Sequence, residues 1–412
     1  MNWLVAGSLI PAFAVSYLVA FLVRILGPRW GWVDRPGGHK NHASPTPTGG
    51  GLAIWAGLVL PLVTGILLLD YLTPGYLTPE SREEILPVSV FDDPALADLI
   101  ENHRGGLLRQ SANLLKLLSA ATVLVLLGLI DDRRGLPWWL RLAVQWLVAA
   151  FMVWQGWRLS LFIDFAPLTI LASVIWIVAL TNTFNMLDNM DGLSAGVAAI
   201  AAGILAAVIL TSPESVIQGP QFFVGGFLLV LVGSLIGFLV HNRPPAKLFM
   251  GDAGSYFVGF CLATASISAT FAGGNLPRHA ILAPLCVLAV PIYDTVTVVV
   301  IRLCEGRSPF SGDRNHISHR LVDLGLSETQ ALLVIYAATG FCGLAAFVLH
   351  LVDTITAAVI LVVILLVLIA IARVDLAARR RHRDESCPTA DENHIAVVGG
   401  GEAPAESRRR TP

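Results

Sequence analysis

Long apolar segments dominate the chain and restrict its fold more than any other feature. Eleven segments have roughly the 20 residues that an α-helix needs to cross the hydrocarbon core of a membrane. They cover about residues 3–26, 50–70, 113–130, 138–156, 166–184, 192–211, 221–240, 253–272, 279–301, 329–350 and 353–372. Only 14% of the 412 residues are charged, whereas soluble domains carry about 25%. The pattern predicts an all-α, polytopic membrane protein with about 11 transmembrane helices.

Positive charge follows the first apolar segment: Arg24 and Arg29 come at its end, and no basic residue precedes it. This order predicts a transmembrane helix that is not cleaved, with the N-terminus outside. With an odd number of crossings, the segments placed inside hold most of the arginines and lysines, including the run Arg379–Arg383. That is the positive-inside pattern. The C-terminus is therefore predicted inside, on the opposite side from the N-terminus.

The predicted membrane domain covers residues 1–375. Within it, residues 71–112 form an acidic loop predicted outside, with a short surface helix near its end. Residues 376–412 are rich in Glu, Gly, Pro and Arg and lack an apolar face, which predicts a disordered tail inside. The five cysteines form no CxxC pair, so neither a zinc site nor a disulfide framework is indicated.

The segment from Asn182 to Gly192 is a dense polar interruption between two apolar runs. Asn185, Asp188 and Asp191 recur every third residue, so a helical turn keeps them on a broad common face. Carboxylates in such a place are costly unless they face water, a metal or a polar substrate. The segment is therefore predicted to be a functional site at a membrane surface.

Asp131 and Asp132 are adjacent at the end of another apolar run. Their charges repel, and the macrodipole of the preceding helix disfavours them. The pair therefore indicates a cation or a general base with a shifted pKa. The alternative is a solvated helix cap with Arg133 and Arg134 as partners.

A third acidic position is Asp252, which stands between Gly251 and Gly254. The glycines allow the backbone to approach a ligand closely. Asp252 can also be the N-cap of the next helix, a role compatible with ligand binding.

Two basic loops complete the side predicted inside. One carries Lys40 and His42 among glycines and prolines, and the other carries Arg314, His316, His319 and Arg320. Two histidines three apart can be half of a zinc site, but no thiolate lies nearby and the arginines repel a divalent cation. Recognition of an anion or sugar phosphate is therefore favoured. Each loop can instead be a basic topology signal.

Carboxylates and amide oxygens suit a hard cation such as Mg²⁺, and the basic loops suit phosphates. Together they predict metal-assisted phosphoryl transfer between a water-soluble diphosphate and a lipid. The rival class is a secondary transporter, which holds its ionisable groups near the bilayer midplane on broken helices. Among the proline-containing spans, the only carboxylate predicted deep within the membrane is that of Asp294. Asp294 is either a partner of the site or a helix-packing group.

In these motifs the chain resembles the polyprenyl-phosphate N-acetylhexosamine-1-phosphate transferase superfamily, glycosyltransferase family 4. The resemblance covers roughly residues 1–350. Its motifs, in order, are Asp34-x-Pro36 with Lys40-x-His42 and Gly49-Gly50; Asp131-Asp132; Asn182-x-x-Asn185-x-x-Asp188-x-x-Asp191-Gly192; Phe249-Met250-Gly251-Asp252-x-Gly254-Ser255; and Ser308-Pro309-Phe310 with Asp313-Arg314-x-His316-x-x-His319-Arg320-Leu321. The resemblance implies transfer of a sugar-1-phosphate from a UDP-N-acetylhexosamine to undecaprenyl or another polyprenyl phosphate, with release of UMP.

The resemblance also implies a role for each motif. Asn185 and Asp252 would ligate Mg²⁺, for which Mn²⁺ can substitute. Asp131 and Asp132 would be catalytic, orienting or deprotonating the lipid phosphate. The substrate-binding residues would be Lys40, His42, Asp188, Asp191, Arg314, His316, His319 and Arg320. The protein would be a multi-pass protein of the bacterial inner membrane with a cytoplasmic-face active-site cleft, would bind no nucleic acid, and could form a homodimer.

The last motif is closer to the N-acetylglucosamine-1-phosphate branch. It lacks the three consecutive histidines typical of the muramoyl-pentapeptide transferases of peptidoglycan synthesis, which are the alternative. Three residues depart from the family pattern. Ser318 stands where this branch commonly has His, His39 where the family usually has Arg, and Asn189 where a Gly usually separates the carboxylates. These departures bear on the donor sugar more than on the reaction type.

Overall fold

The computed structural model describes residues 2–34, 45–71, 94–159, 165–211, 219–269, 278–310, 315–349 and 351–385. The elements in order are α1 (Asn2–Leu26), η1 (Gly27–Trp30), β1 (Val33–Asp34), β2 (Thr46–Pro47), α2 (Gly50–Tyr71), α4 (Pro94–Arg134), α5 (Trp138–Trp154), α6 (Ala166–Leu187), α7 (Leu193–Thr211), α8 (Gly219–Asn242), α9 (Gly251–Ser268), η4 (Arg278–Leu282), α10 (Ala283–Val287), α11 (Ala289–Cys304), α12 (Ile317–Asp323), α13 (Glu328–Leu349) and α14 (Thr354–Glu385). The chain divides into one unit up to Ile364 and a second from Leu365.

Each predicted transmembrane segment overlaps helical residues of the described chain, and the segment 279–301 is divided among η4, α10 and α11. Seven helices are long and apolar enough to cross a membrane: α1, α2, α4, α6, α7, α8 and α13. The η4–α10 segment and α11 pass the same test as a pair bent by 68°. α5 and the start of α14 are apolar but shorter. The protein is thus an all-α, multi-pass membrane protein, and the total of about 11 crossings stays a prediction.

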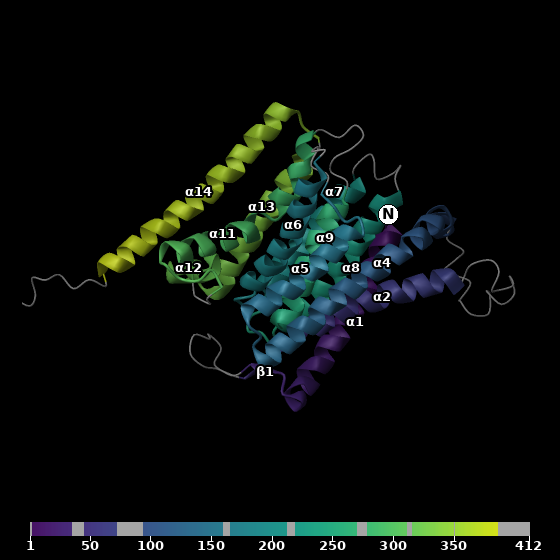
Figure 1. The fold of residues 1–412 in the computed structure, drawn as a ribbon, viewed down its shortest axis with the longest axis horizontal. Coiled ribbons are helices and arrows are strands. Elements are labelled where there is room, and N and C mark those ends of the chain that lie inside the picture. Colours follow the sequence, from purple (N-terminus) through teal and green to yellow (C-terminus); the bar gives the residue numbers. More distant parts are fainter. Residues whose placement is uncertain are drawn as a thin grey trace, which may run out of the picture. The chain divides into compact units, whose positions relative to one another are not determined.

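The helix α9 lies at the centre of the first unit (Figure 1). It contacts α2, α4, α6, α7 and α8, and its residues from Ala253 to Ile267 are buried. Because protein surrounds it, α9 needs no strongly apolar surface, and its Gly, Ala and Ser residues let neighbouring helices approach. This explains why α9 is absent from the seven helices above although it is 18 residues long.

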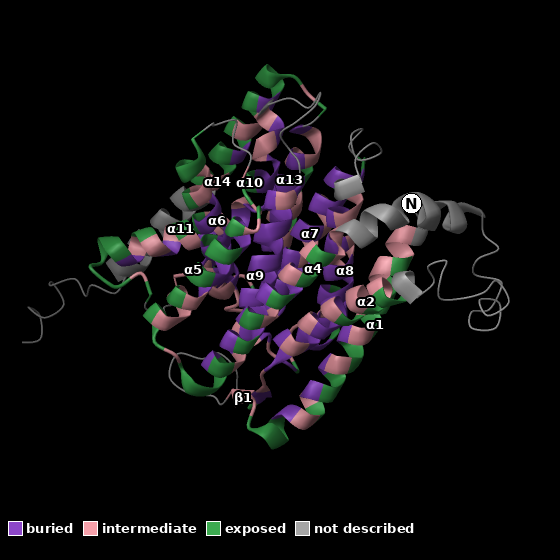
Figure 2. Ribbon diagram, turned by 45° about the vertical axis from the view of Figure 1, so that its right-hand side comes forward, coloured by how far each residue is buried: buried purple, intermediate pink, exposed green. Residues whose placement is uncertain are grey.

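Burial follows the arrangement expected of a helix bundle in lipid. Buried residues are concentrated in α7 and α9, whereas exposed residues recur along α1, α4 and α5 (Figure 2). The exposed side chains include Leu18 at 57%, Leu126 at 54% and Leu147 at 71% exposure. Soluble proteins rarely expose large contiguous apolar areas, so these outward faces suit contact with lipid.

Two helices extend beyond the predicted spans. α4 begins at Pro94, a first-turn position where the missing N–H of proline does no harm, so residues 94–112 of the predicted loop are helical and continuous with the span. α14 continues to Glu385 because its Ala, Leu and Arg residues favour helix after the apolar stretch ends. Residues 72–93 of the loop and 386–412 of the tail lie outside the described residues.

Helix ends carrying the polar motifs meet on one side of the first unit. β1 and β2 form an antiparallel pair that joins Asp34 to Thr46. The chain then turns toward α9, because the backbone N–H of Phe249 donates to Pro47 O at 2.9 Å and that of Gly50 donates to Phe249 O at 2.9 Å. The start of α2 is thereby attached to the start of α9.

Gly128 lets α4 approach the first turn of α9. A Cβ at this position would lie 2.3 Å from both N and Cα of Ala253. We expect Gly128→Val to destabilise the protein by about 3 kcal/mol, measured as a lower thermal unfolding temperature in detergent. The control is Gly340→Val in α13, where no described atom outside the helix's own backbone lies within 4 Å of an added Cβ. Equal stability of the two variants would contradict this packing.

Candidate active site

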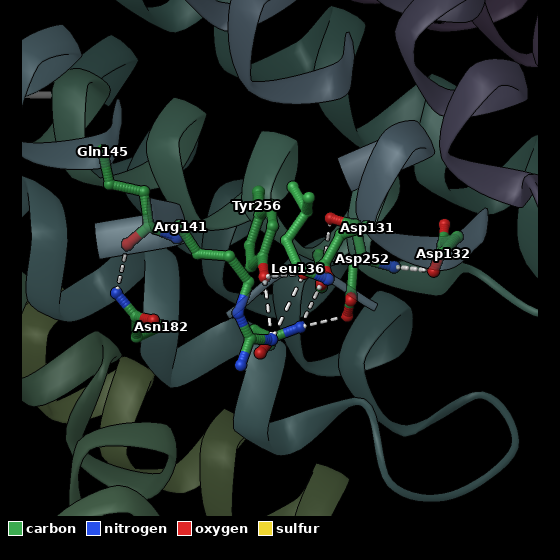
Figure 3. A network of polar contacts seen from close by, with 10 residues as sticks. Asp131, Asp132, Leu136, Arg141, Gln145, Asn182, Asp252 and Tyr256 are labelled. Atoms are coloured by element: carbon green, nitrogen blue, oxygen red, sulfur yellow. Dashed lines mark hydrogen bonds and ion pairs between the residues drawn. The ribbon is translucent and has the colours of Figure 1, made fainter. Parts of the chain in front are cut away.

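Three predicted acidic motifs meet where α4 and α6 end and α9 begins. Asn185 Nδ2 donates to Asp252 Oδ1 at 2.7 Å and to Ser255 Oγ at 3.0 Å. The backbone N–H of Asp252 donates to Asp132 Oδ1 at 2.9 Å, as Figure 3 shows. The structure therefore brings Asp132, Asn185 and Asp252 into one cluster, although up to 120 positions separate them in sequence.

The N-terminus of α9 explains how the end of α4 holds an acidic pair. First-turn N–H groups and the positive end of the helix dipole favour a carboxylate, here that of Asp132. Gly251 has a φ of +72°, in the left-handed region, and a Cβ there would lie 2.6 Å from Asp132 Oδ2. Both the backbone conformation and the nearby carboxylate therefore require glycine.

Asp131 has a different environment from Asp132. It is 5% exposed and accepts hydrogen bonds from the backbone N–H of Leu136 at 2.7 Å and from the hydroxyl of Tyr256 at 2.9 Å. It also forms an ion pair with Arg141 at 3.2 Å (Figure 3). Three donors hold this buried carboxylate in place. Asp132 is exposed, so it is the member of the pair that is accessible to a substrate.

The interpretation of the pair as a cap held by its neighbouring arginines does not describe the structure. Arg133 Nη2 donates to Trp30 O at 3.4 Å, and its guanidinium lies 5.1 Å from the centre of the Trp32 ring. The ion-pair partner of Asp131 is Arg141.

Arg141 and Tyr256 extend the cluster beyond the residues that the motifs single out. Arg141 lies in α5, and Tyr256 lies one turn after Asp252 in α9. One turn further along α5, Gln145 Oε1 accepts a hydrogen bond from Asn182 Nδ2 at 2.5 Å (Figure 3). A charged residue inside an apolar segment indicates a functional position. Arg141 is such a residue, so the sequence contains a signal for its place in the site.

Asp188 follows the last residue of α6. Burial raises the pKa of its carboxyl to about 7, and the negative charges of Asp132 and Asp191 act in the same direction. A hydrogen bond from the backbone of Gly251 partly opposes this rise in the pKa. Asp188 therefore belongs to the same acidic group, and a cation placed there would relieve the repulsion between its members.

Asp191 and Asn242 attach the loop between α6 and α7 to the segment before α9. Asp191 Oδ2 accepts a hydrogen bond from the backbone N–H of Ala246 at 2.8 Å. Asn242 accepts one from the N–H of Gly192 at 3.0 Å and donates another to Leu248 O at 2.9 Å. Asp191, which the sequence predicts as a substrate-side group, positions the loop.

The predicted basic residues His316, His319 and Arg320 are buried around α12. Asp294 of α11, which is 0% exposed, lies 2.8 Å from His316 Nδ1 and accepts a hydrogen bond from the backbone N–H of Ile317 at 2.6 Å. Arg320 Nη2 is 3.8 Å from the same carboxylate. Asp294 is therefore a partner of the predicted basic group rather than only a helix-packing residue.

A side-chain hydrogen bond joins the acidic and basic groups. Ser318 Oγ in α12 donates to Asn189 Oδ1 in the loop after α6. The remaining predicted substrate-binding residues, Lys40, His42 and Arg314, lie outside the described residues.

The donor set fits Mg²⁺. Asp252 supplies a carboxylate, and Asn185 supplies an amide directly beside it. Among the described residues, no three His, Cys, Asp or Glu side chains form a metal site by themselves. Mg²⁺ commonly takes one or two carboxylates and completes its shell with water and substrate phosphates. The acidic group around Asp188 also favours a cation electrostatically.

Comparison with known proteins gives the family. Residues 114–270 match the family model described as glycosyl transferase family 4, a range that includes Asp131, Asp132, Asn185 and Asp252. The histidine-containing loop lies after it.

Curated relatives match most of the chain. A decaprenyl-phosphate N-acetylglucosaminephosphotransferase of Mycobacterium leprae is 32% identical, covering 80% of this chain and 79% of the relative. A probable undecaprenyl-phosphate N-acetylglucosaminyl 1-phosphate transferase of Bacillus subtilis is 29% identical, over 83% and 85%. An undecaprenyl-phosphate alpha-N-acetylglucosaminyl 1-phosphate transferase of Escherichia coli K12 is 26% identical, over 82% of each. The protein therefore belongs to glycosyl transferase family 4, in the branch of these polyprenyl-phosphate N-acetylglucosamine-1-phosphate transferases.

Proposed function

We propose that the protein transfers N-acetylglucosamine-1-phosphate from UDP-N-acetylglucosamine to a polyprenyl phosphate such as undecaprenyl phosphate. The reaction releases UMP and is the first membrane step of a cell-envelope glycan. The observation that carries the proposal is the contact of Asn185 with Asp252, beside Asp132, at helix ends of a multi-pass membrane protein. The names of the relatives support the choice of donor and acceptor.

In the proposed reaction, Asp131 and Asp132 have different roles. An oxygen of the lipid phosphate attacks the β-phosphorus of the nucleotide sugar, and the bond from this phosphorus to the bridging oxygen breaks, so that UMP leaves. Mg²⁺ held by Asn185 and Asp252 would neutralise charge on the diphosphate. Asp132, exposed beside them, orients the lipid phosphate or accepts its proton. Asp131 holds the Arg141 guanidinium next to this position.

Arg141 is expected to contribute positive charge where phosphates bind. We expect Arg141→Ala to lower kcat/KM about 100-fold, because a fixed cation near transferring phosphates is lost. Arg141→Lys should recover part of the activity, since it keeps the charge without the planar guanidinium. The control is Arg158→Ala, because Arg158 lies beyond the other end of α5, where it donates to Val153 O. A full-rate Arg141→Ala variant would contradict this role.

Removal of divalent cations is expected to stop the reaction. Treatment with EDTA should abolish UMP release, and Mg²⁺ should restore it, with Mn²⁺ as a weaker or equal substitute. The reason is that the clustered carboxylates and the diphosphate repel each other without a cation. Activity that persists after complete chelation would contradict the metal assignment.

We infer that the site and the C-terminus face the cytoplasm of a bacterial inner membrane, with the N-terminus outside. Arg24, Arg133 and Arg243 lie at or just after the ends of α1, α4 and α8, which is the side of the site, and positive residues favour the inside. Cysteine labelling from each side of intact vesicles tests this orientation.

The experiment that tests the function compares donors. The purified protein is incubated with polyprenyl phosphate and with UDP-N-acetylglucosamine, UDP-N-acetylgalactosamine or UDP-N-acetylmuramoyl-pentapeptide. We expect UMP and a lipid diphosphate sugar with the first donor. Product from the muramoyl donor alone would favour the muramoyl-pentapeptide alternative. A protein that moves solute across vesicles and releases no UMP from any donor would be a transporter.

A further inference from the structure

The hydrogen bond between Ser318 and Asn189 is partly buried, and a second hydrogen bond orients its acceptor. Ser318 is 0% exposed, and its hydroxyl donates to Asn189 Oδ1. The amide nitrogen of Asn189 donates in turn to Met186 O at 2.9 Å. The last turn of α6 therefore sets the orientation of the Asn189 side chain, so that its oxygen faces α12.

This bond joins the two halves of the candidate site. Asn189 lies next to Asp188 in the acidic loop, and Ser318 lies between His316 and His319 on the basic side. The first turn of α12 is also attached to α11 by Asp294. α12 is therefore held from two directions, and the Ser318–Asn189 bond fixes its distance from the acidic loop.

The side chains at these two positions are matched in size and in hydrogen-bonding capacity. A glycine at position 189 would offer no side-chain acceptor. A histidine at position 318 would be much larger than the serine, which is fully buried. The two side chains are thus complementary, because the small hydroxyl leaves room for the amide and donates to it.

We propose that Asn189 and Ser318 are a specificity-determining pair, which sets the separation between the diphosphate end and the sugar end of the site and so selects the N-acetylhexosamine. The inference rests on the proposed function. Both are positioning residues, since they act through the loop of Asp188 and through α12. Small displacements of groups that hold a substrate change rates strongly, and a single hydroxyl on a substrate is discriminated by correctly placed polar groups.

The test is a double-mutant cycle with Asn189→Ala, Ser318→Ala and the combined variant. The readouts are kcat and KM for UDP-N-acetylglucosamine and UDP-N-acetylgalactosamine, which differ in the configuration of one hydroxyl. We expect each single variant to lower the preference between these donors about tenfold, mostly through KM. The combined variant should lose no more than either single variant, because all three lack the same bond. Asn189→Gly with Ser318→His should keep the reaction but change the preference.

A matched control separates specificity from general stability. Ser266 of α9 accepts a hydrogen bond from Trp176 Nε1 at 2.9 Å and is 4% exposed. Ser266→Ala therefore also removes a buried hydroxyl, yet its donor preference should stay unchanged. Additive effects of the two site substitutions, or an unchanged preference in both, would overturn the proposal.

A readout that needs no activity distinguishes this inference from the proposed function. Hydrogen exchange of the α12 backbone should become about tenfold faster in Asn189→Ala and in Ser318→Ala, and not in Ser266→Ala. Transfer from none of the donors by the unmodified protein would contradict the proposed function. Unchanged exchange in α12 would contradict the pair, whatever the protein transfers.

Discussion

Replacement of Asp252 by asparagine is expected to lower kcat at least about 1000-fold, while the protein remains folded. Asp252 is the carboxylate that contacts Asn185, and its backbone N–H holds Asp132. The substitution keeps the size of the side chain and the backbone hydrogen bond. It removes the negative charge with which a divalent cation would be bound beside the diphosphate.

The measurement is UMP release together with the affinity for Mg²⁺, and thermal unfolding reports whether the variant is folded. Asp323→Asn is the control, because Asp323 is an exposed carboxylate at the end of α12. It should keep full activity. An Asp252→Asn variant with normal kcat and normal dependence on Mg²⁺ would remove Asp252 from the metal site.

Replacement of Asp294 by asparagine is expected to lower kcat about 100-fold through displacement of His316 and α12. The Asp294 carboxylate contacts both the His316 ring and the Ile317 backbone N–H. As a carboxylate it accepts from Nδ1 of His316, which leaves Nε2 directed away from Asp294. Asparagine can still accept from Ile317, but its amide is neutral and does not replace the carboxylate opposite Arg320.

Kinetics of the single variants and of Asp294→Asn combined with His316→Ala measure this effect. If Asp294 acts through His316, the combined variant loses little more than His316→Ala alone. Thr297→Val is the control on the same helix, because the Thr297 hydroxyl donates to Tyr293 O, one turn earlier in α11, at 2.7 Å. Independent, additive losses would mean that Asp294 supports the fold and not the histidine.

The sequence predicted the helices and the acidic positions of the site, but not the partners that hold them. Apolar length identified the helical segments, because a membrane requires about 20 apolar residues per crossing. Partners such as Arg141 and Tyr256 for Asp131 depend on which helices pack together. Asp131 and Tyr256 are 125 positions apart, a distance over which no local pattern carries information.

The adjacent pair Asp131 and Asp132 shows the same limit within two residues. Their sequence context is nearly identical, and the same catalytic role was expected of both. In the structure, one is enclosed by Arg141 and Tyr256, and the other is exposed at the start of α9. The difference arises from the helices that pack beside the pair. The sequence of one apolar segment does not show which helices these are.

In the proposed reaction, the group transferred is the sugar together with the β-phosphate of the UDP-sugar. The most direct measurement uses UDP-N-acetylglucosamine labelled with ³²P in the β-phosphate, polyprenyl phosphate and the purified protein with Mg²⁺. We expect the label to enter the lipid product and unlabelled UMP to be released in equal amount. Label that stays in water-soluble UDP, with unlabelled sugar on the lipid, would contradict it.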